Sequence, residues 1–313
     1  MKEAISKLNK KLGDKLYSGT FLAPSLIGVM IFFIIPFFVV IYYAFIDNPI
    51  GRNFVLFRNF ERVLGNPAFQ DAARHTIQFS AWAVIPAVVL SLALAALLEQ
   101  KLPLKSQLRT FFLSPMMVPV ASIVLIWQVL FHHNGAVNEI LTNISAVTGL
   151  FSYDRAQGEW IDWFYSDFAQ LPIVLLFLWR NLGYNMILFM AALNNIPRDL
   201  LEVASLEGGS RFFVFRTIKL RFLSPTILFV TILSIINSFK IFREVFLLTG
   251  QPDNPLRHPY GGLYMLQHYM NNMFHSLDFQ SLATAAIIMV LVMVLIIGIL
   301  FAAENWYGKD VEG

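Results

Sequence analysis

The sequence predicts an all-α integral membrane protein with six transmembrane helices and both termini in the cytoplasm. Of its 313 residues, 57% are hydrophobic and only 14% are charged, whereas a soluble protein carries about a quarter charged residues. Six apolar stretches are long enough to cross the bilayer core, which takes roughly 20 helical residues. Helices are expected because these stretches are too long and too uniformly apolar for the alternating strands of a membrane barrel.

The predicted spans divide the chain into an N-terminal cytoplasmic segment (1–20), a six-span domain (21–303) and a cytoplasmic tail (304–313). The spans are Phe21–Phe45, Thr76–Leu98, Thr110–Phe131, Leu171–Leu193, Pro225–Leu248 and Leu282–Ala303. The first follows a lysine-rich start, as a signal peptide would. Its apolar run is about twice the usual length for a signal peptide, and no A-x-A cleavage site follows it. We therefore expect it to remain as a membrane helix.

The distribution of Lys and Arg sets the orientation, because these residues favour cytoplasmic loops. With the N-terminus inside, cytoplasmic segments hold 14 of them and outer loops hold 6, while Arg180, Lys240 and Arg243 lie within spans. This bias places the loop between the fourth and fifth spans, residues 197–225, in the cytoplasm.

Several functions are excluded by what the sequence lacks. The absence of Cys rules out disulfides, thiolate metal sites and Cys nucleophiles. The net charge of +3 gives no electrostatic support for nucleic-acid binding. The chain contains no G-x-x-x-x-G-K-[ST], H-E-x-x-H or G-x-S-x-G motif, so neither ATP hydrolysis through a P-loop nor these hydrolytic chemistries are expected. We expect no cofactor on this chain.

The outer loops carry helix signals. Asn59 is expected to cap a turn that ends at Gly65, and Asn66-Pro67 is expected to start a helix that runs into the second span. In the loop 132–170, the segment EWIDWFYSDF (159–168) mixes aromatic and acidic residues. It is either an aromatic anchor at the membrane surface, which we favour, or a docking surface for an external partner.

The 197–225 loop predicts two short helices joined by a tight turn. Pro197 suits a helix start, Gly208 suits a left-handed position at its end, and Ser210 suits the cap of a second helix. An apolar stripe recurs at helical spacing at Leu200, Leu201, Val203, Ala204 and Leu206. By residue pattern alone, the loop is equally an elbow lying on anionic lipid or a docking element for a soluble cytoplasmic protein.

The loop resembles the EAA motif of ABC importer permeases, which reads roughly E-A-A-x-x-x-G and continues to I-x-L-P. The matching positions are Glu202, Ala204, Gly208, Gly209, Ile218 and Leu220. Val203 replaces the second motif residue, and Arg221 replaces the final Pro, which should let the second helix run further. Five stretches, 21–45, 57–80, 113–131, WRNLGYNMILFMAALNNIPRDLLEVASLEGG (179–209) and INSFKIFREVFLLTG (236–250), resemble carbohydrate permeases of the maltose and glycerol-phosphate type in the same order.

That resemblance implies a type I importer permease, in the position of the first of two permeases. It implies a second, homologous permease subunit as a heterodimer partner, two cytoplasmic ATPase subunits that hold ATP-Mg, and an extracytoplasmic solute-binding protein. The 197–225 loop would be the coupling element that docks on an ATPase subunit. The location would be the inner or plasma membrane of a bacterial or archaeal cell, with lipid around the spans and no nucleic acid.

Polar side chains within the spans are candidates for the path of the transported solute, because charges in the membrane usually face a cavity or a partner. Arg180 and Lys240 lie nine and eight residues from the outer ends of their spans, which puts both roughly 12–14 Å deep at 1.5 Å per residue. Lys240 and Glu244 are spaced to pair along one helix. The candidates are Asn237, Lys240, Arg180, Asn185, Trp127, Gln128 and Glu244. The competing interpretation is that Arg180 and Lys240 form structural ion pairs or extend to the membrane surface.

Two alternatives compete with a sugar importer subunit, and only the second belongs to a different function class. A permease for glycerol phosphate or a polyol differs only in its solute. A self-sufficient secondary transporter would need internal repeats and interrupted half-helices, and the sequence shows neither clearly.

Overall fold

The computed structural model describes residues 19–100, 103–148, 161–249 and 261–308, and within them every regular element is helical. The first helical run, Gly19–Ala44, contains the π-turn η1 (Met30–Ile34) and α2 (Ile35–Ala44). The elements that follow are α3 (Arg58–Leu64), α4 (Pro67–Glu99), α5 (Lys105–Met117), α6 (Val120–Leu130), α7 (Ala136–Thr148), α8 (Gln170–Asn194), α9 (Arg198–Leu206), α10 (Arg211–Val214), the π-turn η3 (Phe215–Lys219), α11 (Leu220–Phe239), α12 (Arg243–Thr249), η4 (Gly261–Leu263), α13 (Leu266–His275) and α14 (Phe279–Gly308).

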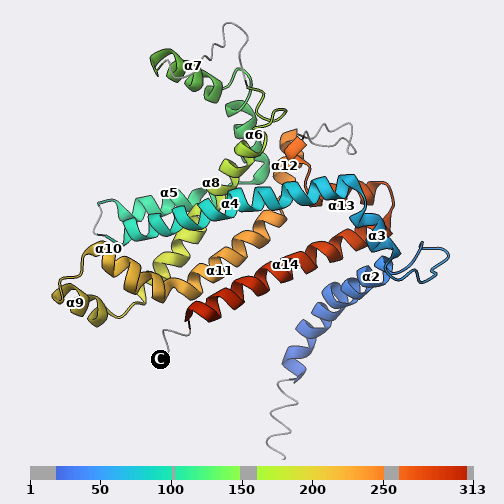
Figure 1. Cartoon of the computed structure of the whole chain (residues 1–313), viewed down its shortest axis with the longest axis horizontal. Helices are drawn as coiled ribbons and strands as arrows, with labels where there is room; N and C mark the ends of the chain where they lie inside the picture. Colours follow the sequence, from blue (N-terminus) through green and yellow to red (C-terminus); the bar gives the residue numbers. More distant parts are fainter. Residues whose placement is uncertain (1–18, 101–102, 149–160, 250–260, 309–313) are drawn as a thin grey trace, which may run out of the picture.

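The body of the molecule is a bundle of long helices that run between two ends (Figure 1). Helix α4 packs against α8 and α11, and α14 packs against α11 and α2. The α9–α10 segment lies at one end, and α3 and α13 lie at the other. Helix α6 leads away from the bundle to α7, which projects from it. Along α4, buried residues such as Ala72, Phe79, Ala83 and Ala87 recur mostly every three or four positions, as expected for a helix with one face in a core.

Within the described residues, five helical runs are long and apolar enough to span a membrane, and there are six when the bent helix pair α5–α6 is counted as one span. The runs are Gly19–Ala44, Pro67–Glu99, Gln170–Asn194, Arg211–Thr249 and Phe279–Asn305. This agrees with the prediction of an all-α membrane protein with six spans.

Two predicted spans are interrupted, which the sequence did not clearly indicate. The third is not one helix: α5 and α6 meet at an angle of 99°. Val118 between them is extended, with φ −76° and ψ 132°, because a residue before proline avoids the helical conformation and Pro119 donates no backbone hydrogen bond. The fifth begins earlier than Pro225, at Arg211, and breaks at residues 240–242 before α12. Pro86, by contrast, lies inside α4 without ending it.

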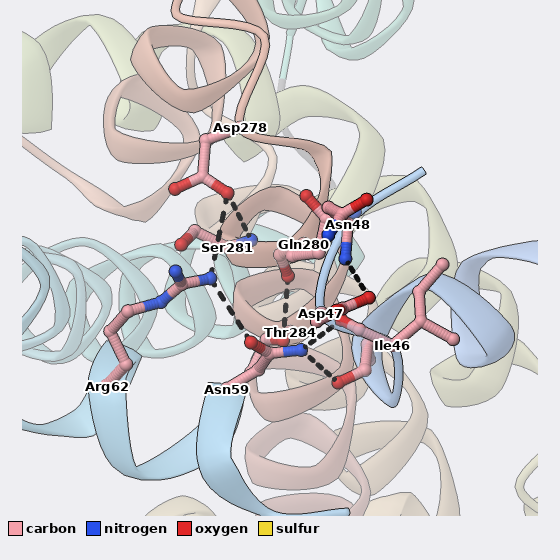
Figure 2. Close-up of polar contacts among 10 residues, drawn as sticks. Ile46, Asp47, Asn48, Asn59, Arg62, Asp278, Gln280, Ser281 and Thr284 are labelled. Atoms are coloured by element: carbon pink, nitrogen blue, oxygen red, sulfur yellow. Dashed lines mark hydrogen bonds and ion pairs between the residues drawn. The ribbon is translucent and has the colours of Figure 1, made fainter. Parts of the chain in front are cut away.

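Asn59 fastens the first span to the bundle rather than capping a helix, so that prediction is wrong (Figure 2). Asn59 is a buried residue of α3, and its Nδ2 donates to the carbonyls of Ala44 and Ile46 at 2.9 and 2.8 Å. These carbonyls lie where α2 ends and backbone groups lose their helical partners. Arg62 donates to Asn59 Oδ1 at 3.2 Å and approaches Asp278 at 3.8 Å. The predicted start at Asn66-Pro67 is confirmed, because Asn66 Oδ1 accepts from Ala68 N at 2.9 Å.

Helices α5 and α8 approach each other with their backbones almost in contact. A Cβ atom built on Gly183 of α8 would lie 1.9 Å from the carbonyl oxygen of Phe112 in α5. Small residues at membrane helix interfaces allow this kind of approach. Gly183 therefore sets the position of the bent pair against the bundle.

Burial lowers the pKa of His268 in α13 from 6.5 to about 3. Between these values the unfolded chain binds a proton at this histidine that the folded chain does not. The free energy of unfolding is therefore unaffected by the protonation of His268 above pH 6.5 and decreases as the pH falls through this window, from 6.5 towards 3. We expect His268→Phe to reduce this pH dependence, measured as thermal unfolding in detergent above and within the window. His275→Phe, which changes an exposed histidine on the same helix, is the control. Equal pH slopes for wild type and His268→Phe would contradict the expectation.

Candidate functional site

A cavity of about 480 Å³, here called the central cavity, lies where the fifth span is interrupted. Its walls come from α5, α8, α11, the 240–242 break and α12. The lining residues are Met116, Leu176, Phe177, Arg180, Asn181, Tyr184, Leu233, Asn237, Lys240, Ile241 and Glu244. The structure thus brings together Arg180, Asn237, Lys240 and Glu244, four of the seven residues proposed from the sequence.

Arg180 and Glu244 form an ion pair across the central cavity wall. Arg180 Nη1 donates to Glu244 Oε1, and the two side chains are 27% and 14% exposed. Glu244 lies in the first turn of α12, where a helix favours negative charge. This is the structural pair that one interpretation of Arg180 expected.

Lys240 does not pair with Glu244, contrary to the spacing argument. The helix ends at Phe239 and restarts at Arg243, so the two residues are not one turn apart on a continuous helix. Lys240 lies in the break of the fifth span, is exposed, and makes no ion pair with any residue that the structure describes. The described lining of the central cavity therefore has one positive charge in excess.

The amide groups of the central cavity lie next to this charge. Asn237 Nδ2 donates to Asn181 Oδ1 at 3.4 Å, and Asn181 Nδ2 donates to the carbonyl of Phe177 at 2.8 Å. Tyr184 also lines the cavity and was not among the sequence candidates. Tyr184 lies four residues after Arg180 and so on the same face of α8, and this spacing could have identified it as a candidate from the sequence.

Three sequence candidates lie outside the central cavity and connect helices instead. Trp127 is buried, packs against Trp179 in a tilted arrangement with ring centroids 5.3 Å apart, and donates from Nε1 to the Pro172 carbonyl at 2.9 Å. Gln128 donates to the Leu247 carbonyl at 3.2 Å, and Asn185 donates to Ser234 Oγ at 3.1 Å. Their polar groups are used by neighbouring helices and do not line the central cavity, and their assignment to the solute path stays a prediction.

The 197–225 loop has the predicted helix–turn–helix form. Gly208 adopts φ +76°, which glycine accepts without steric cost. A Cβ on Gly209 would lie 2.8 Å from the Ala204 carbonyl, so the turn also closes tightly there. Ser210 caps α10 by accepting from Phe213 N at 3.2 Å. On α9, Glu202, Val203 and Leu206 are exposed, and Leu206 reaches 86%.

The second helix of this loop continues without interruption into the fifth span, as the replacement of Pro by Arg221 predicted. Residues 211–239 are helical throughout, with the π-turn η3 at Phe215–Lys219. Ile218 and Leu220, the last two motif positions, lie at this π-turn and are half-buried. The loop and the wall of the central cavity are therefore joined by one helical rod.

The loop 132–170 is organised around a buried amide. Asn138 Nδ2 donates to the carbonyls of His132, His133 and Ile161, and its Oδ1 accepts from Trp163 Nε1 at 3.1 Å. Trp163 and Phe164 are buried in the core, so the aromatic-anchor prediction is wrong for them. Residues 159–160 lie outside the described residues.

Within the described ranges, no group of three or more His, Asp or Glu side chains is placed to hold a metal ion. The polar chemistry of the central cavity is instead that of hydrogen-bond donors, acceptors and charges.

Comparison with known proteins identifies relatives along most of the chain. The model of the family described as "Binding-protein-dependent transport system inner membrane component" matches residues 87–305. The probable starch degradation products transport system permease protein AmyD of Thermoanaerobacterium thermosulfurigenes is 27% identical over 80% of this chain and 82% of its own length. The lactose transport system permease protein LacF of Rhizobium radiobacter is 29% identical over 75% and 76%.

A solved structure shares the fold. A chain of a bacterial ABC transporter involved in the import of the acidic polysaccharide alginate superposes with a TM-score of 0.76 and 17% identity, covering 96% of this chain and 98% of that one.

Proposed function

Because this chain belongs to the family of binding-protein-dependent transport system inner membrane components, we propose that it takes up a carbohydrate as the membrane subunit of an ATP-driven importer. The family consists of transport permeases rather than enzymes. The names of relatives support a sugar or oligosaccharide as the solute, since they specify starch degradation products, lactose and arabinooligosaccharides. The observation that carries the proposal is the family match over 87–305, which includes the central cavity and the 197–225 loop.

The central cavity suits such a solute. Asn181, Asn237 and Tyr184 offer amide and hydroxyl groups, which exchange hydrogen bonds with sugar hydroxyls. The cavity lies beside the interrupted fifth span, and non-helical backbone at membrane depth is tolerated where it lines a water-filled space. A second permease subunit would complete the path from the other side, and an extracytoplasmic binding protein would deliver the solute.

The 197–225 loop, now called the coupling loop, would dock on one of two cytoplasmic ATPase subunits. ATP-Mg would be bound there and not on this chain. Its exposed residues Glu202, Val203 and Leu206 offer a mixed charged and apolar surface, which fits a protein interface. When the ATPase subunits close, the loop would move and the continuous helix 211–239 would carry that movement to Asn237 in the central cavity. The proposed boundaries remain 1–20, 21–303 and 304–313, with both termini in the cytoplasm of a bacterial or archaeal cell.

Reconstitution tests the function. The chain would be co-expressed with the neighbouring permease, ATPase and binding-protein genes, and ATP hydrolysis would be measured in proteoliposomes with maltotriose, lactose, arabinotriose or glycerol 3-phosphate. We expect one of the sugars to stimulate hydrolysis. Stimulation by glycerol 3-phosphate alone would favour the alternative solute, and solute uptake by the isolated chain would overturn the subunit proposal.

Gly208→Val should weaken the link between ATP hydrolysis and transport. A β-branched residue is strained at φ +76°, and the left-handed conformation costs roughly 1–2 kcal/mol for a residue with a side chain. A Cβ atom at this position would meet no atom within 4 Å, so the effect would come from the backbone alone.

The measurement is binding-protein-stimulated ATP hydrolysis relative to basal hydrolysis. Gly208→Asn is the matched control, because asparagine tolerates this conformation. Equal stimulation of the valine and asparagine variants would show that the turn conformation is not needed.

A further inference from the structure

An ion pair joins the coupling loop to the far end of the second span. Lys219 Nζ lies 2.6 Å from each carboxylate oxygen of Glu99. Glu99 is the last residue of α4, and Lys219 is the last residue of η3. The side chains are 25% and 18% exposed, so solvent and salt screen the pair less than a surface pair.

The carboxylate of Glu99 does not stabilise α4, the helix that it ends. A carboxylate at a helix C-terminus opposes the helix dipole, which favours cations at that end. Lys105 Nζ, which donates to the Glu99 carbonyl at 3.4 Å, supplies such a cation. The negative side chain of Glu99 is compensated by Lys219, from a helix that the chain reaches 120 residues later.

The π-turn gives Lys219 its direction. A π-turn adds one residue to a helix, which rotates the following positions by about 100° relative to an uninterrupted α-helix. Lys219 is the last residue of η3, so the angle between the side chains of Arg211 and Lys219 differs from that in an uninterrupted α-helix.

The pair lies at the edge of a cavity of about 860 Å³ beneath the coupling loop. Gly209, Arg211 and Phe212 from the loop line one side, and Ala96, Glu99 and Gln100 from α4 line the other. Because space separates the loop from the bundle here, the ion pair provides a direct connection between them. In Figure 1, α9 lies beyond the ends of the long helices.

We propose that the Glu99–Lys219 ion pair holds the coupling loop to the second span, so that a force on the loop moves the second and fifth spans together. The proposal rests on the proposed function, since it takes the ATPase subunits as the source of the force. Lys219 and Glu99 are positioning residues, and neither lines the central cavity. The helix that contains Lys219 reaches Phe239 beside the central cavity, and α11 also packs on α4, so the movement would reach the α11 wall of the central cavity together with α4.

Distance measurements on the assembled transporter test this. The chain has no cysteine, so on this chain spin labels attach only at introduced cysteines, here at the exposed positions Gln100 and Thr217, and the labelled chain is then assembled with its unlabelled partners. The separation of the labels would be measured by electron paramagnetic resonance in the complex with its ATPase subunits, before and after trapping with MgATP and vanadate. We expect one narrow distance distribution that is the same in both states.

Charge variants complete the test. Glu99→Lys and Lys219→Glu should each lose the narrow distribution, and the double variant E99K/K219E should restore it. Arg216→Met is the matched control, because Arg216 lies in the same π-turn, is exposed and makes no ion pair with a described residue.

The outcomes separate this proposal from the proposed function. Co-purification of the ATPase subunits with each variant reports whether the importer assembles, independently of the label distances. A separation that changes on vanadate trapping in the wild type would overturn the proposal, since the pair would then open during the cycle. Single variants that keep the narrow distribution, or a charge-swapped variant that fails to regain it while assembling normally, would overturn it as well.

Discussion

Replacing Gly183 with valine is expected to prevent the bent helix pair from packing on the bundle. A Cβ atom at this position would lie 1.9 Å from the Phe112 carbonyl oxygen, 2.4 Å from its carbonyl carbon and 2.9 Å from Leu113 N. All three are backbone atoms, so no side-chain rotation relieves the clash. Overpacking typically costs about 1–3 kcal/mol, and a clash with backbone belongs at or above the upper end of that range.

Detergent-solubilised protein gives the measurement, as the folded fraction by size-exclusion chromatography and as the unfolding temperature. Gly183→Ala should be intermediate between wild type and Gly183→Val. Gly298→Val is the matched control, because Gly298 lies in another membrane helix and its Cβ would meet no atom within 4 Å. If Gly183→Val behaved like Gly298→Val, α5 and α8 could not be in backbone contact.

Removing Glu244 alone should destabilise the protein more than removing Glu244 and Arg180 together. Glu244→Ala would leave the partly buried guanidinium of Arg180 without its carboxylate, and the Arg180 Nε atom already has no hydrogen-bond partner among the described residues. Breaking one side of a buried ion pair costs roughly 3–5 kcal/mol, whereas replacing both charges by apolar residues is often neutral. The 27% exposure of Arg180 places the expected loss at the lower end of that range.

A double-mutant cycle with Glu244→Ala, Arg180→Ala and R180A/E244A measures this coupling as differences in the free energy of unfolding. Glu61→Ala serves as a control, because Glu61 is exposed and pairs with no described cation. Additive single effects would mean that the pair contributes no coupling energy. Transport by the double variant would then report whether the two charges also matter for the solute.

The apolar cores of the long helices could be predicted from hydropathy. The cap at Ser210 and the left-handed Gly208 could also be predicted, since both depend on local chemistry within a few residues. Asn59 shows the limit of such reasoning. Its local pattern indicated a helix cap, but carbonyls 13 and 15 residues earlier in the chain take its amide instead. Competition from distant backbone groups has no local signal.

The interruption of the fifth span had no sequence signal either. Residues 240–242 are Lys, Ile and Phe, with neither proline nor glycine. The groups that hold the break come from other helices, including Ser80, whose Oγ lies 2.7 Å from Ser238 Oγ, and Gln128, which donates to the Leu247 carbonyl. Counting residues from the span ends predicted that Arg180 and Lys240 lie at similar depth, and both line the central cavity. That Glu244 pairs with Arg180 and not with Lys240 follows from the helix break, which the sequence does not indicate.

The interrupted fifth span also has a consequence for hydration and leakage. Helix ends expose backbone groups that hydrocarbon cannot satisfy, and Lys240 adds a charge beside them at membrane depth. The central cavity is therefore expected to stay wet between transport events, with water reaching well below the membrane surface. A hydrated pocket reduces the thickness of the low-dielectric region that an ion must cross. The resting importer must therefore keep tightly packed apolar side chains on one side of this pocket. Proton or ion conductance of reconstituted variants would thus reveal which packing contacts form that seal.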